Sequence, residues 1–352
     1  MKSLHNKNNS HNTLSQKQSQ FKLQFLLLHC DCIGRLVVFC AHTELLSLYR
    51  SEYIVCDGTF EMAPTTSYQL YTFHGFVNGE AMALAWALLP NKTQATYVEL
   101  LTALRSAMVS VYGDAGGAKT FLVDFELAAV NAIKEVFPES VVKGCSFHFR
   151  QALYRHVQSE GLAREYEQPD SVIRGWLRQV LAMSALPAFA IPLVWQWLQV
   201  PPAYDPIMYA KAVAFASYVD RTWIRGDFPP SLWSHYDNLG PRTTNVAEGW
   251  HNGLNSRFGM PHPSLRVFLN WLQKAQYETQ CRGIQLAAGR SPKPRKAAYV
   301  NVDSQMWSAK LQYSVEIGKV FCGTFPHPST WYQFYDSSVR YLNHVSHLLG
   351  CN

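Results

Sequence analysis

The sequence predicts a mixed α/β core that carries a large all-helical insertion. Two observations lead to this prediction. Across residues 53–160, short apolar runs typical of strands alternate with segments that have helical periodicity. Residues 161–240 then show helical periodicity between prolines, without comparable strand signals. The chain has 352 residues, of which 48% are hydrophobic and 13% aromatic, so it can bury a sizeable core.

Strands are expected first in residues 53–60, 68–77 and 81–89. The first two segments are rich in Tyr, Phe, Ile and Val, which favour pleated strands. Asn78-Gly79 separates the second segment from the third, and this dipeptide is a strong signal for a two-residue hairpin turn. We therefore expect an antiparallel meander.

Helices and strands alternate after the meander. Residues 94–112 have apolar side chains at helical spacing, and Gly113 follows as a stop signal. The same reasoning predicts, in order, a strand at 120–124, a helix at 126–137, a strand at 141–144 and a helix at 147–160. The order β-β-β-α-β-α-β-α gives a mixed sheet with helices on both faces. This order matches the ribonuclease H-like fold.

The chain is expected to divide into five segments. Residues 1–40 are a disordered or unassigned N-terminal tail, because their beginning is almost entirely polar. Residues 41–160 are the first part of the ribonuclease H-like core, and residues 161–240 are the helical insertion. Residues 241–290 supply the C-terminal helices of the core, and residues 291–352 are an unassigned tail.

Three carboxylates occupy positions from which they could converge. Asp57 lies within the first strand, Asp124 ends a later strand, and Glu248 lies in a helix predicted for residues 243–258, after the insertion. Ligands collect at the carboxyl ends of strands in open α/β sheets. Carboxylate oxygens suit Mg²⁺ or Mn²⁺ rather than Zn²⁺. Two such ions would activate an attacking water or 3′-hydroxyl and stabilise the leaving oxygen of a phosphodiester.

Asp57 and Asp124 also have purely structural interpretations. Asp57 could cap a turn before Gly58, although a carboxylate among apolar residues is costly to bury unless it is hydrogen-bonded or meets a cation. Asp124 could be the N-cap of the helix that follows it, a frequent role for aspartate. Their joint placement in this topology favours the metal-binding interpretation.

The helix that carries Glu248 has an unusual polar face. Its apolar residues recur at helical spacing and can pack on the sheet: Val246, Trp250, Leu254 and Phe258. The polar face beside them contains Thr244, Asn245, Glu248, His251, Asn252 and Asn255. A solvated helix normally shows Lys and Glu there, whereas this face suits contacts to phosphates or a ligand. An ordinary polar surface is the alternative.

A second group of interest is Cys145-Ser146-Phe147-His148, which directly follows a short strand. A cysteine and a histidine three residues apart could bind zinc together with ligands from elsewhere in the chain. A packed cysteine beside a hydrogen-bonded histidine is an equally good interpretation. Both interpretations stay open on the sequence.

Together these motifs resemble the Mutator-like element (MULE) transposase domain over roughly residues 40–290. The segments that carry the resemblance are Asp-Gly-Thr-Phe at 57–60, Asp124, Cys-x-x-His at 145–148, the helical insertion, and Thr-Asn-x-x-Glu-x-x-His-x-x-Leu-Asn at 244–255. The resemblance implies a DDE transposase that cuts DNA at transposon ends and joins the 3′-hydroxyl to target DNA.

The resemblance also implies roles for individual residues. Asp57, Asp124 and Glu248 match the family's catalytic acids, which would hold two Mg²⁺ or Mn²⁺ ions. Cys145 and His148 match a motif with a structural or DNA-positioning role. The same kind of role is expected for the helix residues Asn245, His251 and Asn255.

Other functional classes remain open on the sequence. One alternative is a domesticated or decayed transposase-derived protein that binds DNA without catalysis, because residues 1–40 show no complete Cys/His set for a zinc-binding recognition module. Another is an interaction module built on the Trp-rich insertion, although tryptophans in helical segments are more often core residues.

Charge and cysteine usage agree with a nuclear DNA-acting protein. The net charge of +6 and pI near 8.8 are compatible with a DNA partner, but are too mild to argue for one alone. The eight cysteines are scattered without a Cys-x-x-Cys pair, which favours reduced intracellular thiols. We expect a nuclear location and no membrane partner. The sequence leaves the oligomeric state open, and a homo-oligomer is one of the states that it allows. The basic string at 292–296 is either a nuclear signal or a solvated linker.

Overall fold

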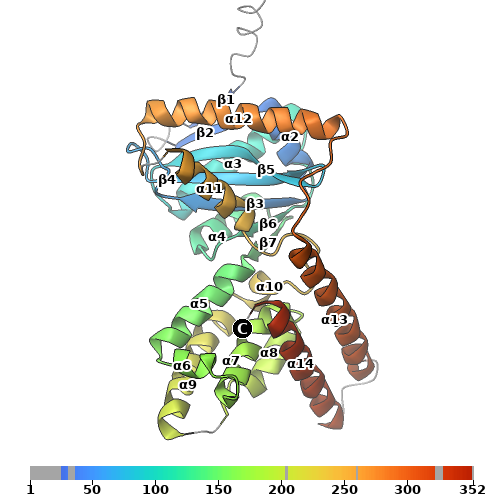
Figure 1. The fold of residues 1–352 in the computed structure, drawn as a ribbon. Coiled ribbons are helices and arrows are strands. Elements are labelled where there is room, and N and C mark those ends of the chain that lie inside the picture. The colour runs from blue at the N-terminus through green and yellow to red at the C-terminus, as the bar shows by residue number, and fades with distance from the viewer. Residues whose placement is uncertain (1–24, 31–35, 203–204, 259–260, 322–327, 351–352) are drawn as a thin grey trace, which may run out of the picture. The chain divides into compact units, whose positions relative to one another are not determined.

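The structure is a computed structural model that describes residues 25–30, 36–202, 205–258, 261–321 and 328–350. Most of the predicted N-terminal tail lies outside these ranges. The chain forms two compact units (Figure 1). The first unit comprises Met1–Lys119, Glu135–Glu139 and Val246–Pro292. The second unit comprises Thr120–Lys134, Ser140–Asn245 and Lys293–Asn352.

The predicted meander lies in the first unit. It consists of β3 (Tyr53–Thr59), β4 (Gln69–Val77) and β5 (Glu80–Leu89), with β4 paired antiparallel to both neighbours. Asn78 and Gly79 join β4 to β5 with φ angles of 48° and 82°, the positive values that a type I′ hairpin turn requires. The predicted strands and hairpin are therefore confirmed.

The strands of the first unit are ordered β1-β2-β5-β4-β3. β1 (Phe25–Cys30) pairs antiparallel with β2 (Leu36–Ala41), and β2 pairs antiparallel with β5. Both segments are unassigned on the sequence. Their sequences, FLLLHC and LVVFCA, are short continuous apolar runs, and periodicity alone cannot separate a buried strand from a buried helix in such a run.

Helices cover both faces of this sheet. They are α2 (His42–Arg50), α3 (Gln94–Tyr112), α11 (Asn245–Phe258, whose first residue belongs to the second unit) and α12 (Leu265–Ala287). Tyr71 of β4 packs against Tyr97 of α3, with ring centroids 5.1 Å apart. Its neighbour Leu70 lies in a core cluster with Leu254 of α11 and Phe268 of α12. Successive strand residues point to opposite faces, so the two helical layers cover opposite sides, as predicted.

The second unit contains the predicted β-α-β sequence. Its members are β6 (Thr120–Val123), α4 (Leu127–Val136), whose last two residues belong to the first unit, and β7 (Val141–Gly144). β6 and β7 pair in parallel, as a helical crossover requires. α5 (Ser146–Ser159) follows β7 at once. Antiparallel and parallel pairs together confirm the predicted mixed α/β class, consistent with a ribonuclease H-like fold.

The insertion is helical, as predicted. Its elements are α6 (Ala163–Glu167), α7 (Val172–Ala182), the 3₁₀ turn η1 (Met183–Ala185), α8 (Ala190–Leu198), α9 (Pro206–Val219), the π-helical turn η2 (Asp220–Ile224) and α10 (Pro230–Trp233). Trp176, Trp195, Trp223 and Trp233 are buried in the core of this unit. Their role is therefore packing, the more frequent role of such tryptophans.

Residues beyond 292 complete the core of the second unit. α13 (Ala297–Phe321) and α14 (Pro328–Leu348) stack Tyr313 on Tyr341, with ring centroids 4.4 Å apart. The Tyr341 hydroxyl donates to the Ala185 carbonyl at 2.9 Å. This segment, unassigned on the sequence, thus packs on the insertion (Figure 1). In the described ranges, none of the helices has the length and apolar character needed to span a membrane.

Candidate active site

Asp57 points into a polar network beneath α11. It pairs with Thr72 across the β3–β4 register, so both side chains project from the same face of the sheet. Its Oδ1 accepts the Gly58 N–H at 2.9 Å, and its Oδ2 lies 3.0 Å from Nδ1 of His251. Only 8% of the residue is exposed. The carboxylate is therefore buried, partnered and held in one orientation.

The network continues from His251 through Thr72 to His74. Nε2 of His251 is 3.2 Å from Oγ1 of Thr72, which is 3.0 Å from Nε2 of His74. Burial and the neighbouring His251 lower the pKa of His74 to about 3, so His74 is neutral at pH 7. Thr72 and His74 were not predicted from the sequence. The available signal was that Thr72 and His74 are polar and two positions apart in a mostly apolar strand. That spacing puts both side chains on one face of the sheet.

The glycine of the Asp-Gly-Thr-Phe segment has a packing reason. A Cβ on Gly58 would lie 1.7 Å from Nε2 of Gln69, and Gln69 is itself fixed by accepting the Tyr97 hydroxyl at 3.1 Å. β3 continues through Thr59. Asp57 therefore lies inside a strand rather than at a turn, although its carboxylate does accept the next backbone N–H, as the capping interpretation proposed.

α11 turns part of its predicted polar face toward the sheet. His251 is 6% exposed and lies on the same side as the buried residues Ala247 and Leu254. The physical reason is that the sheet beneath it is polar at Asp57 and Thr72, so a histidine there gains hydrogen bonds that an apolar residue would not.

The other predicted residues of α11 are more accessible. Glu248 is half-buried, and Asn245 is exposed at the first position of the helix. Asn255 is half-buried, and its Nδ2 donates to a carboxylate oxygen of Glu61 at 3.4 Å. His251 is therefore buried against Asp57, whereas Asn245 is in contact with solvent.

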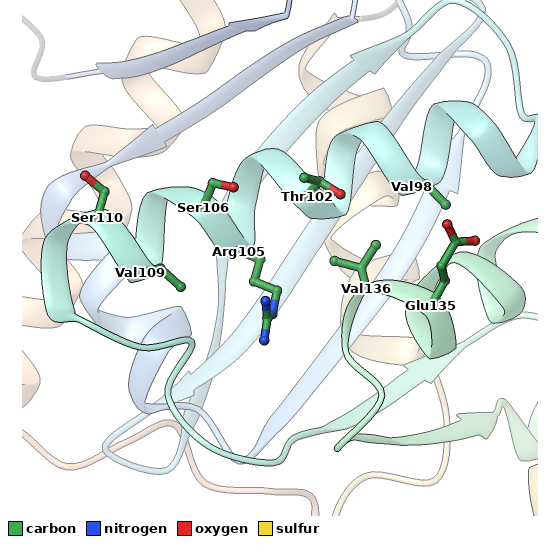
Figure 2. Close-up of a pocket in the computed structure, with 8 residues that line it drawn as sticks. All are labelled: Val98, Thr102, Arg105, Ser106, Val109, Ser110, Glu135 and Val136. Atoms are coloured by element: carbon green, nitrogen blue, oxygen red, sulfur yellow. The ribbon is translucent and has the colours of Figure 1, made fainter.

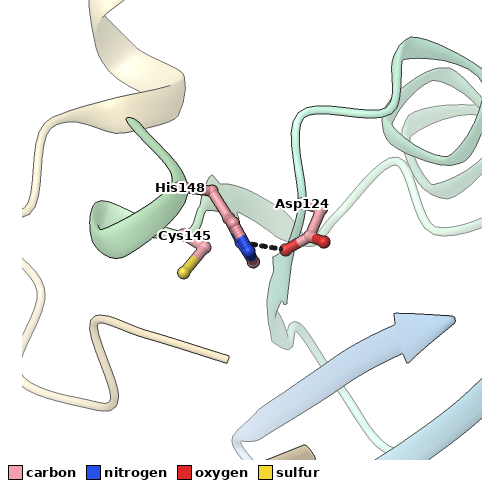
Figure 3. Close-up of side chains that lie close together, drawn as sticks. All are labelled: Asp124, Cys145 and His148. Carbon is pink, nitrogen blue, oxygen red and sulfur yellow. Dashed lines mark ion pairs between the residues drawn. The ribbon is translucent and has the colours of Figure 1, made fainter. Parts of the chain in front are cut away.

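In the second unit, Asp124, Cys145 and His148 lie together (Figure 3). One ligand atom from each lies within 4.8 Å of the others. Nδ1 of His148 is 2.6 Å from Oδ1 of Asp124. Hydrogen bonds to Asp124 and then to Cys145 raise the pKa of His148 to about 10, against the opposing effect of burial. His148 is therefore an imidazolium at pH 7, paired with the Asp124 carboxylate.

Local structure explains why these three residues meet. Asp124 and Cys145 directly follow the parallel strands β6 and β7, whose carboxyl ends lie at the same edge. The Cys145 N–H donates to the Val123 carbonyl at 2.8 Å. Cys145 is then the N-cap residue of α5, and His148 lies in its first turn. The Cys-x-x-His spacing thus places both side chains beside Asp124.

Thr244 closes this group from the end of the insertion. Its N–H donates to Sγ of Cys145 at 3.3 Å, and its Oγ1 lies 3.4 Å from the same sulfur and 3.5 Å from Oδ1 of Asp124. The chain before it is tied to the strand ends, because the Ser146 N–H donates to the Arg242 carbonyl at 2.8 Å. The Asp124 carboxylate therefore contacts the side chains of His148 and Thr244, instead of acting mainly as the N-cap considered above.

A hollow of about 530 Å³ lies elsewhere in the first unit, between α3 and the end of α4 (Figure 2). Thr102, Arg105 and Glu135 help to line it. None of the residues predicted for the site is among its lining residues. We therefore place the candidate chemistry at the two carboxylate groups, not at this hollow. The convergence of Asp57, Asp124 and Glu248 on shared ions stays a prediction.

Residues 53–152 match the family model described as the MULE transposase domain. Over these residues the match confirms the resemblance that the motifs indicate, and it supports a Mutator-like element transposase. It contains Asp57, Asp124, Cys145 and His148, and it ends before Glu248. No curated protein matches the chain.

Proposed function

Because residues 53–152 match the MULE transposase domain, we propose that the chain is a DDE transposase-type core. It would cleave DNA phosphodiesters in a metal-dependent reaction and transfer the resulting 3′-hydroxyl to target DNA. The catalytic carboxylates would be Asp57, Asp124 and Glu248. The observation that carries the proposal is Asp57, a buried carboxylate oriented from both oxygens by Gly58 and His251 within the matched segment.

The proposed cofactor is a pair of Mg²⁺ or Mn²⁺ ions. Carboxylate oxygens from Asp57, Asp124 and Glu248 are the hard donors that these ions prefer. Bound ions would activate the attacking oxygen and stabilise the leaving one. The chain itself supplies orientation: His251 holds Asp57 through Nδ1, and the network behind it anchors the ring through Thr72. Such partners behind a ligand raise its precision and affinity.

The proposed partners follow from the same chemistry. Transposon ends and target DNA would be the substrates, and a net charge of +6 is compatible with a polyanion. Asn245 is exposed at the start of α11, where its amide can contact phosphates. The proposed location is the nucleus, where such DNA is found, and homo-oligomer formation would let one assembly hold two DNA ends.

A cleavage assay tests this proposal. The full chain is incubated with DNA and Mg²⁺ or Mn²⁺, alongside Asp57→Asn, Asp124→Asn and Glu248→Gln. Each substitution should abolish detectable cleavage and joining. Glu52→Gln is the matched control, because Glu52 is an exposed acid next to the start of β3, and it should cleave like the parent. An Asp57→Asn protein as active as the parent would remove Asp57 from the catalytic set.

A second candidate function is DNA binding without catalysis. The observation that favours it is that Asp57 and Asp124 each face a histidine of the protein itself, so both carboxylates can be satisfied without ions. This function predicts binding that weakens between about 50 and about 200 mM salt, with no cleavage in either metal. Cleavage that disappears in the triple carboxylate variant would exclude it.

A further inference from the structure

We propose that Asp124, Cys145 and His148 form a binding site for one Zn²⁺ ion. This site differs in chemistry from the proposed Mg²⁺ or Mn²⁺ site, although the two share Asp124. The inference rests on the geometry of the second unit, and only its last consequence depends on the proposed function.

The donor set is the first reason. A carboxylate oxygen, a thiol sulfur and an imidazole nitrogen lie within 4.8 Å of one another (Figure 3). Zn²⁺ takes oxygen, sulfur and nitrogen ligands in a tetrahedral arrangement, and sites with three protein ligands keep a fourth position for water or substrate. Sulfur is a poor ligand for Mg²⁺. Cys145 therefore selects for zinc over magnesium in a way that the acidic residues do not.

Hydrogen bonds to the Cys145 sulfur are the second, independent reason. The Thr244 N–H is 3.3 Å from Sγ, and the Thr244 hydroxyl is 3.4 Å from it. Both groups are donors suited to a thiolate. Donors behind a metal ligand of this kind orient and strengthen it.

The partly exposed side chains of Asp124 and His148 give the ion a route into the site. Cys145 is fully buried, whereas the side chains of Asp124 and His148 are 39% and 27% exposed. Zn²⁺ can therefore enter from the solvent side and meet the sulfur at the base of the site. Binding replaces the proton between Asp124 and His148 by the ion, and the thiol of Cys145 loses its proton. The released protons pass to solvent, so the charges balance.

Cobalt substitution tests the site without any DNA reaction. Co²⁺ bound to a thiolate gives a charge-transfer absorption band in the near ultraviolet, and added Zn²⁺ should displace the Co²⁺. We expect one Co²⁺ per full-length chain, loss of the band in Cys145→Ser, and a clear loss of affinity in His148→Gln, which removes one of the three ligands. Cys281→Ser is the matched control, because Cys281 is a half-buried free thiol in α12, and it should keep the band.

Two outcomes would overturn the proposal: absence of the band in the parent, or a band that survives Cys145→Ser. Circular dichroism establishes that each variant folds, and His148→Gln keeps the test decisive if Cys145→Ser does not fold. If the chain also cleaves DNA, Zn²⁺ should inhibit the parent by occupying Asp124, and Cys145→Ser should be less inhibited. Since the cobalt band is measured without DNA, failure of the zinc site and failure of the nuclease are distinguishable.

Discussion

The two units present carboxylate–histidine pairs that differ in burial. In the first unit, the Asp57 and His251 side chains are 9% and 8% exposed, and the histidine leads into a closed network with Thr72 and His74. In the second unit, Asp124 and His148 are far more exposed, and their other neighbour is the sulfur of Cys145. A buried pair keeps one geometry because breaking it leaves an unpaired charge in the protein interior. A half-exposed pair can exchange a partner, because water compensates for the loss.

The largest expected effect is on the buried pair. His251→Ala should lower the free energy of unfolding by about 3 kcal/mol, because it leaves the Asp57 carboxylate buried beside an unfilled space. His148→Ala should lower it by less, since water reaches Asp124 and screens the pair. Urea unfolding of both variants measures the difference. Equal losses would show that burial does not separate the two pairs.

Acid should destabilise both units through buried neutral histidines. Burial is the main cause that lowers the pKa of His74, in the first unit, and of His235, in the second, to about 3. The unfolded chain binds their protons near pH 6.5, so stability is full above that pH and falls as pH drops toward 3. The slope should approach about 1.4 kcal/mol per pH unit for each histidine.

Thermal unfolding between about pH 7 and about pH 5 measures this slope, with His74→Gln and His235→Gln each expected to make the profile shallower. Gln is chosen because its amide can replace the hydrogen bonds of the imidazole to Thr72 and to the Gly144 carbonyl. A parent profile that is flat across this range would contradict the assignment of both rings as neutral.

Thr244 should matter for metal binding more than for stability. Thr244→Val keeps the shape of the side chain but removes the hydroxyl that lies 3.4 Å from Cys145 Sγ. We expect the affinity for Co²⁺ or Zn²⁺ to fall about tenfold. The matched control is Thr243→Val at the half-buried neighbouring position. Equal affinities of the two variants would remove Thr244 from the group that supports the metal site.

The smallest expected effect is the stability that the pair of Asp124 and His148 loses at alkaline pH. The Asp124 carboxylate, followed by Cys145, raises the pKa of His148 to about 10. The ion pair stabilises the fold fully below about pH 6.5, the ordinary pKa of histidine in the unfolded chain. This stabilisation is lost as pH rises through 10. The stability difference between the parent and His148→Ala should therefore shrink as pH rises. A difference that grows with pH would show that the histidine is not charged beside Asp124.

Local patterns were enough to predict most of the elements. The strands β3 to β7 and the helix α3 follow from apolar periodicity, and the hairpin follows from Asn78-Gly79, whose positive φ angles suit those residue types. β1, β2, α13 and α14 were not predicted. Their partners lie in distant segments, as the pairing of β2 with β5 and the hydrogen bond from Tyr341 to the Ala185 carbonyl show, and no local window contains that information.

The sequence by itself determined which residues stand at the ends and middles of strands, and so identified Asp57, Asp124 and the Cys-x-x-His turn as chemically distinctive. Only the tertiary structure decided what each one faces. His251 is buried against Asp57, and Thr244 lies against Cys145. Most of the core and the insertion separate the first pair along the chain, and α5 with the insertion separates the second. The reason is physical: side-chain periodicity is set by neighbouring residues, whereas the charge and hydrogen-bond partners of a side chain depend on which distant segments pack against it.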